Sequence, residues 1–145
     1  MPRAMGARRY AQAVLQLALE HTELDRWLLD LRALNEVLQS DDLRLYLEAA
    51  RIPLAERLNI LSSRLADLGP LARNLAGLLV ERGRLELVPA ILEEYEHRYN
   101  AQQGISEVEV RTAVPLEAME VARLRERLVA RTGKQVILHT VVEPE

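Results

Sequence analysis

The chain has no cysteine and no phenylalanine, and Trp27 is its only tryptophan. The missing cysteines exclude disulfide bonds, thiolate metal sites and cysteine nucleophiles, and they suit a reducing compartment. Aromatic residues make up 3% of the chain and apolar residues 49%, so the core must be aliphatic, built from Leu, Ala and Val. With 145 residues, the chain is long enough for one domain or two small ones.

The charge balance and the short apolar runs exclude further classes of protein. The net charge of −3 argues against a dedicated nucleic-acid binder, which usually carries a basic excess. No apolar run approaches the length of about 18 residues that spans a bilayer, so no direct membrane insertion is expected. No apolar stretch of signal-peptide type follows the first residues.

Catalytic signatures are also missing. The glycines are isolated from one another, and no phosphate-binding loop of the G-x-x-x-x-G-K-[ST] kind is present. His21, His97 and His139 fall in three separate elements and lack metal-ligand spacing. We therefore predict no enzyme and no catalytic residue, cofactor or metal site.

Apolar periodicity predicts helices throughout the first hundred residues. Thr22 is the expected N-cap of the second helix, Ser40 to Asp42 offer polar capping groups for the third, and Gly83 is the C-cap candidate of the fifth. The fold class is therefore mainly α, with a six-helix bundle over residues 1–103. The expected helices span residues 4–20, 24–38, 40–50, 53–67, 71–82 and 86–103.

The pattern changes after Gly104. Residues 106–114 alternate between apolar and polar, residues 116–131 form a charged helix, and residues 135–142 are rich in β-branched side chains. This predicts a small, incomplete α+β region of strand-helix-strand order over residues 104–145. Two strands and one helix bury little surface, so this region is expected to need support from elsewhere.

The first helix is apolar around more of its circumference than one core requires. Its apolar positions sweep roughly 240° at 3.6 residues per turn, and those of the fifth helix roughly 200°, whereas a helix on a small domain needs an apolar stripe of about 100°. Either both helices are buried on all sides within the bundle, which periodicity alone favours, or they frame a groove for an amphipathic helix from a partner. For Arg8 and Arg9, a pair of solvent-exposed side chains is the favoured interpretation.

Several motifs resemble one family in order and spacing. The stretch Ala7–Ala13 fits the Ala-Arg-x-Tyr-Ala-x-Ala pattern in the opening helix of the ATP synthase delta subunit family, which includes the mitochondrial oligomycin-sensitivity-conferring protein. Asn74–Leu85 resembles the fifth helix of that family and the turn after it, and Val108–Leu116 resembles its strand into the carboxy-terminal region. Thr132-Gly133-Lys134 and Val142-Glu143-Pro144 match two later turns.

The resemblance implies a non-catalytic stator subunit of the proton-translocating ATP synthase, on the cytoplasmic face of the bacterial inner membrane. Its bundle would bind the amino-terminal helix of an alpha subunit, and its carboxy-terminal region would hold the b-subunit stalk. The family normally continues beyond Glu145 with a hairpin and a last helix, so the b-subunit contact is expected to be weakened or lost if the chain ends there. Ala11, Leu15 and Ala18 would face the core. The groove residues carried over from the family are Tyr10, Ala13, Val14, Leu17, Asn74, Leu75, Leu78 and Arg82.

One alternative comes from a different class. The first helix also resembles the opening helix of the NusB antitermination family, which implies an RNA-binding, all-helical protein. The acidic balance and the strand-helix-strand region oppose this interpretation.

Overall fold

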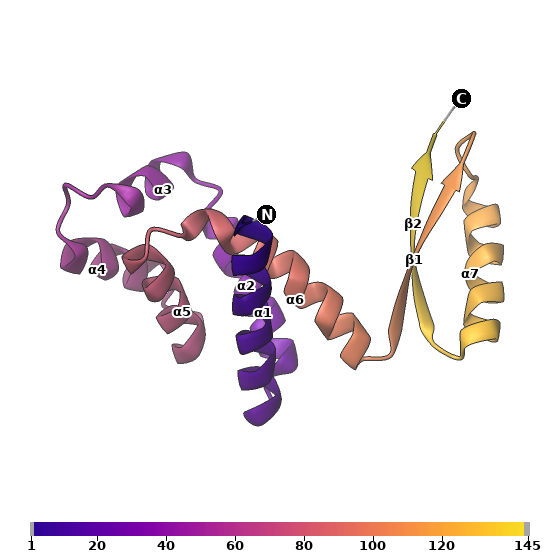
Figure 1. The fold of residues 1–145 in the computed structure, drawn as a ribbon, viewed down its shortest axis with the longest axis horizontal. Coiled ribbons are helices and arrows are strands. Elements are labelled where there is room, and N and C mark those ends of the chain that lie inside the picture. Colours follow the sequence, from indigo (N-terminus) through magenta and orange to yellow (C-terminus); the bar gives the residue numbers. More distant parts are fainter. Residues whose placement is uncertain (1, 144–145) are drawn as a thin grey trace. The chain divides into compact units, whose positions relative to one another are not determined.

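The computed structural model describes residues 2–143, with side chains from Gly6 onward, as two compact units that meet between Glu96 and His97 (Figure 1). The first unit is helical, and the second is built around a small sheet. The predicted fold class, mainly α, is confirmed. Each unit is described by itself.

The first unit contains the predicted helices, with a short 3-10 turn before the sixth. Their bounds differ from the prediction by a few residues at each end. In chain order they are α1 (Pro2–Glu20), α2 (Leu24–Val37), α3 (Asp41–Glu48), α4 (Leu54–Arg64), α5 (Pro70–Glu81), η1 (Leu85–Leu87) and α6 (Val88–Gln102), whose last turns belong to the second unit.

Local capping explains most of these bounds. The Ser40 hydroxyl accepts a hydrogen bond from the backbone N–H of Leu43 at 3.4 Å, as predicted. Gly83 directly follows the C-cap of α5 with φ of 64°, which glycine adopts without steric cost. The prediction for Thr22 is wrong, because Glu23 is the N-cap of α2. Thr22 has φ of 56° and ends α1, in a Schellman turn where Glu23 N–H donates to Ala18 O at 2.8 Å.

The core of the first unit is aliphatic apart from two aromatic side chains, Trp27 and Tyr95. Tyr95 of α6 is fully buried, and its hydroxyl donates to the carbonyl oxygen of Leu24 at 2.7 Å, so the polar tip is satisfied. Leu31 and Leu34 of α2 are about as buried, and α2 contacts both α1 and α5. Helix α2 is therefore the central element on which α1 and α5 are placed.

The second unit is a strand-helix-strand unit. Strands β1 (Ile105–Thr112) and β2 (Gln135–Val142) pair in parallel, from Ile105 opposite Gln135 to Thr112 opposite Val142. Helix α7 (Ala118–Thr132) connects them and contacts β2. The unit begins within α6, seven residues before the expected boundary at Gly104. The reason is that the last turns of α6 interact with β1, where His97 is hydrogen-bonded to Glu107.

Candidate functional site

Helices α1 and α5 border two hollows, one at each end of the pair. A hollow of about 420 Å³ lies at the start of α5. It is lined by His21 just after α1, by residues of α2 such as Trp27, and by residues 66–72, which lead into α5. A hollow of about 340 Å³ lies between Tyr10 and Ala13 in the first half of α1 and Arg82 at the end of α5. The two helices therefore run antiparallel on either side of one surface, which we call the α1/α5 groove.

Helix α1 divides its apolar residues between the core and this groove. Ala7, Ala11, Val14 and Ala18 are buried, as successive turns of one stripe. Tyr10 and Leu17 are half-buried and Ala13 is exposed. These three residues follow i, i+3, i+7 spacing. They lie on the same helical face as His21, which lines the first hollow. The wide apolar arc thus belongs to two surfaces, and this chain covers only one of them.

Helix α5 shows the same division. Its core stripe consists of Ala72, Ala76, Leu79 and Val80. A second stripe runs from one hollow to the other, with Leu71 and Arg82 at its ends. Leu75 and Leu78 lie between these ends at i+4 and i+7 from Leu71. Leu75 is half-buried, and Leu78 is 36% exposed, so large apolar side chains border the groove.

Two of the eight predicted groove residues need correction. Val14 is 2% exposed, because it lies three residues after Ala11 and four before Ala18 in the buried stripe. Asn74 is exposed, but it lines a different hollow of about 560 Å³, together with Leu58 and Ser62 of α4. Leu78 lines that hollow too and neither of the two groove hollows, so its assignment to the groove rests on its i+7 spacing from Leu71.

The other predicted positions fall as follows. Tyr10, Ala13 and Arg82 meet at one hollow, and Leu17 and Leu75 occupy the stripes that join the two hollows. Of the predicted core positions on α1, Ala11 and Ala18 are fully buried and Leu15 is half-buried.

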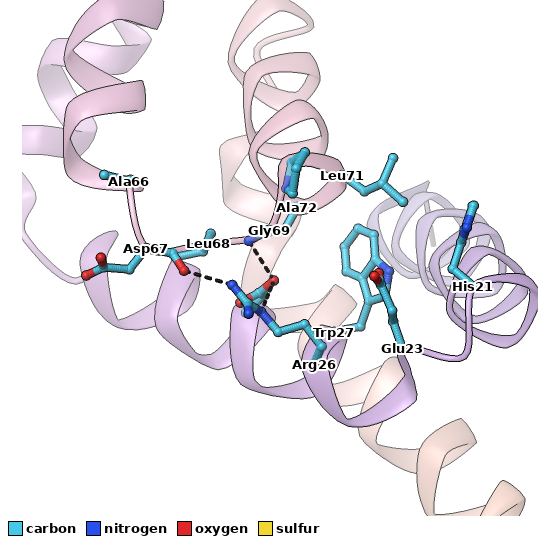
Figure 2. Close-up of a pocket in the computed structure, with 12 residues that line it drawn as sticks. His21, Glu23, Arg26, Trp27, Ala66, Asp67, Leu68, Gly69, Leu71 and Ala72 are labelled. Carbon is cyan, nitrogen blue, oxygen red and sulfur yellow. Dashed lines mark hydrogen bonds and ion pairs between the residues drawn. The ribbon is translucent and has the colours of Figure 1, made fainter.

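A buried carboxylate that sequence reasoning missed fixes the start of α5. Asp30 of α2 is 6% exposed; its Oδ1 accepts a bond from Arg26 Nε at 3.0 Å, and its Oδ2 accepts one from the Gly69 N–H at 3.1 Å. Arg26 Nη2 also donates to the carbonyl oxygen of Asp67 at 2.8 Å (Figure 2). A Cβ at position 69 would lie 3.1 Å from Asp30 Oδ2, so glycine allows this close approach. The network ties α2 to the N-cap of α5 and thereby sets that side of the groove.

The lone tryptophan forms the floor of the first hollow. The indole of Trp27 is 2% exposed, and in the close-up its ring lies below Leu71 and to the left of His21 (Figure 2). Its Nε1 is a buried donor that has no hydrogen-bond partner among the described residues. Because no other indole exists in the chain, tryptophan fluorescence reports on the surroundings of Trp27 alone.

The second unit brings together two of the histidines that the sequence places in separate elements. His97 Nδ1 is hydrogen-bonded to Glu107, and His139 Nε2 lies 3.6 Å from the other carboxylate oxygen. Burial raises the pKa of Glu107. The hydrogen bond and charge of His97, with hydrogen bonds from His139 and Asn100, outweigh burial and hold the pKa below 4.5.

Residues 2–143 contain neither a candidate metal-binding cluster nor a candidate membrane-spanning helix. No trio of His, Asp or Glu side chains in this part of the chain is arranged to hold a metal ion. None of the helices in the same range combines the length and the apolar character that crossing a bilayer requires.

Comparison with known proteins gives consistent matches. The sequence model of the ATP synthase delta (OSCP) subunit matches residues 7–145. ATP synthase subunit delta of Dehalococcoides mccartyi is 32% identical over 95% of this chain and 76% of that relative. The same subunit of Rubrobacter xylanophilus is 36% identical over 94% and 77%. A chain in the cryo-EM structure of the Toxoplasma gondii mitochondrial ATP synthase hexamer shares the fold, with a TM-score of 0.65 at 23% identity over 94% of this chain and 78% of that one.

Proposed function

Because this chain belongs to the ATP synthase delta (OSCP) subunit family, we propose that its α1/α5 groove binds the amino-terminal helix of an alpha subunit. Membership makes the chain a peripheral-stalk, or stator, subunit of ATP synthase. We predicted an RNA-binding helical protein as the alternative. It is not proposed, because the family match includes the strand-helix-strand unit.

The observation that supports the groove assignment is a pair of unburied apolar stripes beside one surface. Tyr10, Ala13 and Leu17 line one side, and Leu75 and Leu78 belong to the other. An amphipathic helix presents anchors at i, i+3 or i+4, and i+7, which is the spacing of both stripes. Such a helix would cover the half of the α1 apolar arc that the bundle leaves open.

Tyr10 is well suited to be the anchor of this contact. Its ring is half-buried, and it lines the smaller hollow beside Ala13 and Arg82. Aromatic side chains with a polar tip bury large apolar area while the hydroxyl keeps a hydrogen-bonding partner or water, and they are enriched at interfaces.

In this proposal the protein has a mechanical task. The bundle grips the catalytic head through the alpha-subunit helix, the second unit contacts the b-subunit stalk, and the linkage keeps the head from turning with the rotor. No chemical step is involved, and the complex lies at the cytoplasmic face of a bacterial inner membrane. The b-subunit contact stays a prediction.

The test uses isothermal titration calorimetry with a synthetic peptide of the alpha-subunit amino-terminal helix. Leu78→Asp and Tyr10→Asp should each weaken peptide binding by more than about tenfold. Either substitution would bury an unpaired carboxylate beneath the apolar face of the peptide. Trp27 emission should shift on titration, since the indole is the floor of the groove.

Leu45→Asp is the matched control. Leu45 is 67% exposed and belongs to α3, not to either groove helix, so the same change of side chain should leave peptide affinity unaltered. Circular dichroism would verify that all three variants keep their helical content. Undiminished binding by Leu78→Asp and Tyr10→Asp would refute the groove assignment.

A further inference from the structure

Three arginines converge on one end of the α1/α5 groove. Arg9 of α1, Arg82 at the end of α5 and Arg84 after it line the 340 Å³ hollow with Gly6, Tyr10 and Ala13. No carboxylate is among these lining residues, and within the described part of the chain none of the three guanidinium groups forms an ion pair. The hollow therefore concentrates positive charge beside an aromatic ring.

Three other arginines of the helical unit have acidic partners. Arg8, one position before Arg9, faces away from the hollow and lies 3.6 Å from Glu94. Arg26 pairs with Asp30 at 3.0 Å, and Arg32 of α2 lies 3.4 Å from Glu96. The bundle thus provides acidic partners for these arginines, but not for the three that line the hollow.

The backbone around the hollow accommodates these side chains. Arg84 Nη1 lies 3.7 Å from the position that a Cβ at Gly6 would take, an ordinary van der Waals distance, so that guanidinium lies beside α1. Gly83, with φ of 64°, turns the chain so that Arg84 N–H donates to the carbonyl oxygen of Leu79 at 2.8 Å. Arg82 is the C-cap of α5, where the negative end of the helix dipole stabilises a cation.

The opposite end of the groove has the opposite charge. The hollow of about 420 Å³ is lined by Glu23, Asp30 and Asp67 against the single guanidinium of Arg26. A helix lying in the groove therefore meets a field that runs from positive beside the first half of α1 to negative beside its end. Complementary charge is a strong determinant of orientation at interfaces.

We propose that the hollow formed by Arg9, Arg82 and Arg84 binds a carboxylate of the partner helix. The groove then selects an amphipathic helix that carries Asp or Glu at the end lying beside the start of α1, and it fixes the direction in which that helix binds. Guanidinium groups suit this role because their planar N–H donors match a carboxylate in bidentate geometry. This proposal rests on the proposed function and adds the chemistry and the polarity of the partner.

The test is a double-mutant cycle measured by isothermal titration calorimetry. The protein carries Arg82→Gln or Arg9→Gln, and the alpha-subunit peptide has each Asp and Glu changed in turn to Asn or Gln. Either protein variant should weaken binding about tenfold, as charge-assisted hydrogen bonds typically do. The amide peptide that lacks the docking carboxylate should bind the unaltered protein just as weakly, and it should lose no further affinity to Arg82→Gln.

Arg8→Gln is the matched control, because it removes the same charge from the same helix outside the hollow. It should change affinity by less than about twofold. Equal affinities of all amide peptides for the unaltered protein, or arginine variants that behave like Arg8→Gln, would overturn this proposal and leave the groove assignment standing. Absence of any peptide binding to the unaltered chain would instead overturn the proposed function, and this proposal with it.

Discussion

The two units differ in how much apolar surface they bury. Within residues 6–143, every fully buried apolar side chain except Val136 belongs to the helical unit, between Ala7 and Tyr95. Helix α7 has no buried residue at all, although Leu124 and Leu128 face the strands closely enough to be half-buried. One unit is thus held by a packed core, and the other by the parallel pairing of two strands.

The comparison shows where a binding surface can be left open. A unit with a complete core tolerates apolar side chains such as Leu78 at its surface, because its fold does not depend on covering them. The strand-helix-strand unit lacks a complete core of this kind, because two strands and one helix have only marginal stability on their own. The groove therefore lies on the part of the chain best able to keep its shape.

The largest expected effect is on the free energy of unfolding, and it compares the cores of the two units directly. Leu34→Ala should lower the free energy of unfolding of the helical unit by about 2–5 kcal/mol, because the 1% exposed side chain leaves a cavity. Leu128→Ala, the matched change in α7, should cost about 1 kcal/mol or less, since that side chain is only half-buried. Urea unfolding followed by circular dichroism measures both, and equal losses would contradict the comparison.

A smaller effect tests how the groove is held within the helical unit. Asp30→Ala should destabilise this unit by about 1–3 kcal/mol, because the Gly69 N–H and the Arg26 guanidinium lose a buried acceptor. Glu36→Ala, an exposed change on the same helix, should alter stability by less than about 0.5 kcal/mol. Thermal unfolding distinguishes them. A loss no greater than that of Glu36→Ala would mean that the network does not fix α5.

The smallest expected effect concerns pH and the second unit. The pKa of Glu107 is held below its ordinary value of 4.5, so its ion pairs stabilise the folded state above pH 4.5. That contribution is lost as pH falls through the folded pKa. The stability difference between the unaltered chain and Glu107→Gln should therefore be present at about pH 5.5 and shrink as the pH falls below 4.5.

Nuclear magnetic resonance signals of β1, followed through thermal unfolding, measure this difference. The effect should be small, because Glu107 keeps 24% of its side chain exposed. A difference that grows on acidification would contradict the assigned direction.

Local features of the fold could be predicted from the sequence, and long-range ones could not. Ser40 and Gly83 act within one turn of chain, so their residue types suffice to place helix ends. The prediction that Thr22 is the N-cap of α2 was wrong because the turn that ends α1 sets the conformation of this residue. Asp30 bonds to a residue 39 positions away, and only the fold brings the two together.

The groove was predicted with an error that periodicity explains. Resemblance predicts Tyr10, Ala13 and Leu17 as groove residues, and they lie on α1 outside its core stripe. Val14 lies at the edge of that stripe, and the wheel alone cannot assign it. Asn74 sits one turn before Leu78, and the packing of α4 decides which side of α5 it faces. The arginine cluster went unnoticed because Arg9 and Arg84 are far apart in sequence.

The most direct test of the central claim is a titration of the isotopically labelled chain with the alpha-subunit peptide, followed by nuclear magnetic resonance. The account predicts that amide shifts change along Tyr10–His21 and Leu71–Arg82, while those of Ala118–Thr132 stay in place. Changes confined to the second unit, or none in α1 and α5 at saturating peptide, would contradict the claim that these two helices form the binding groove.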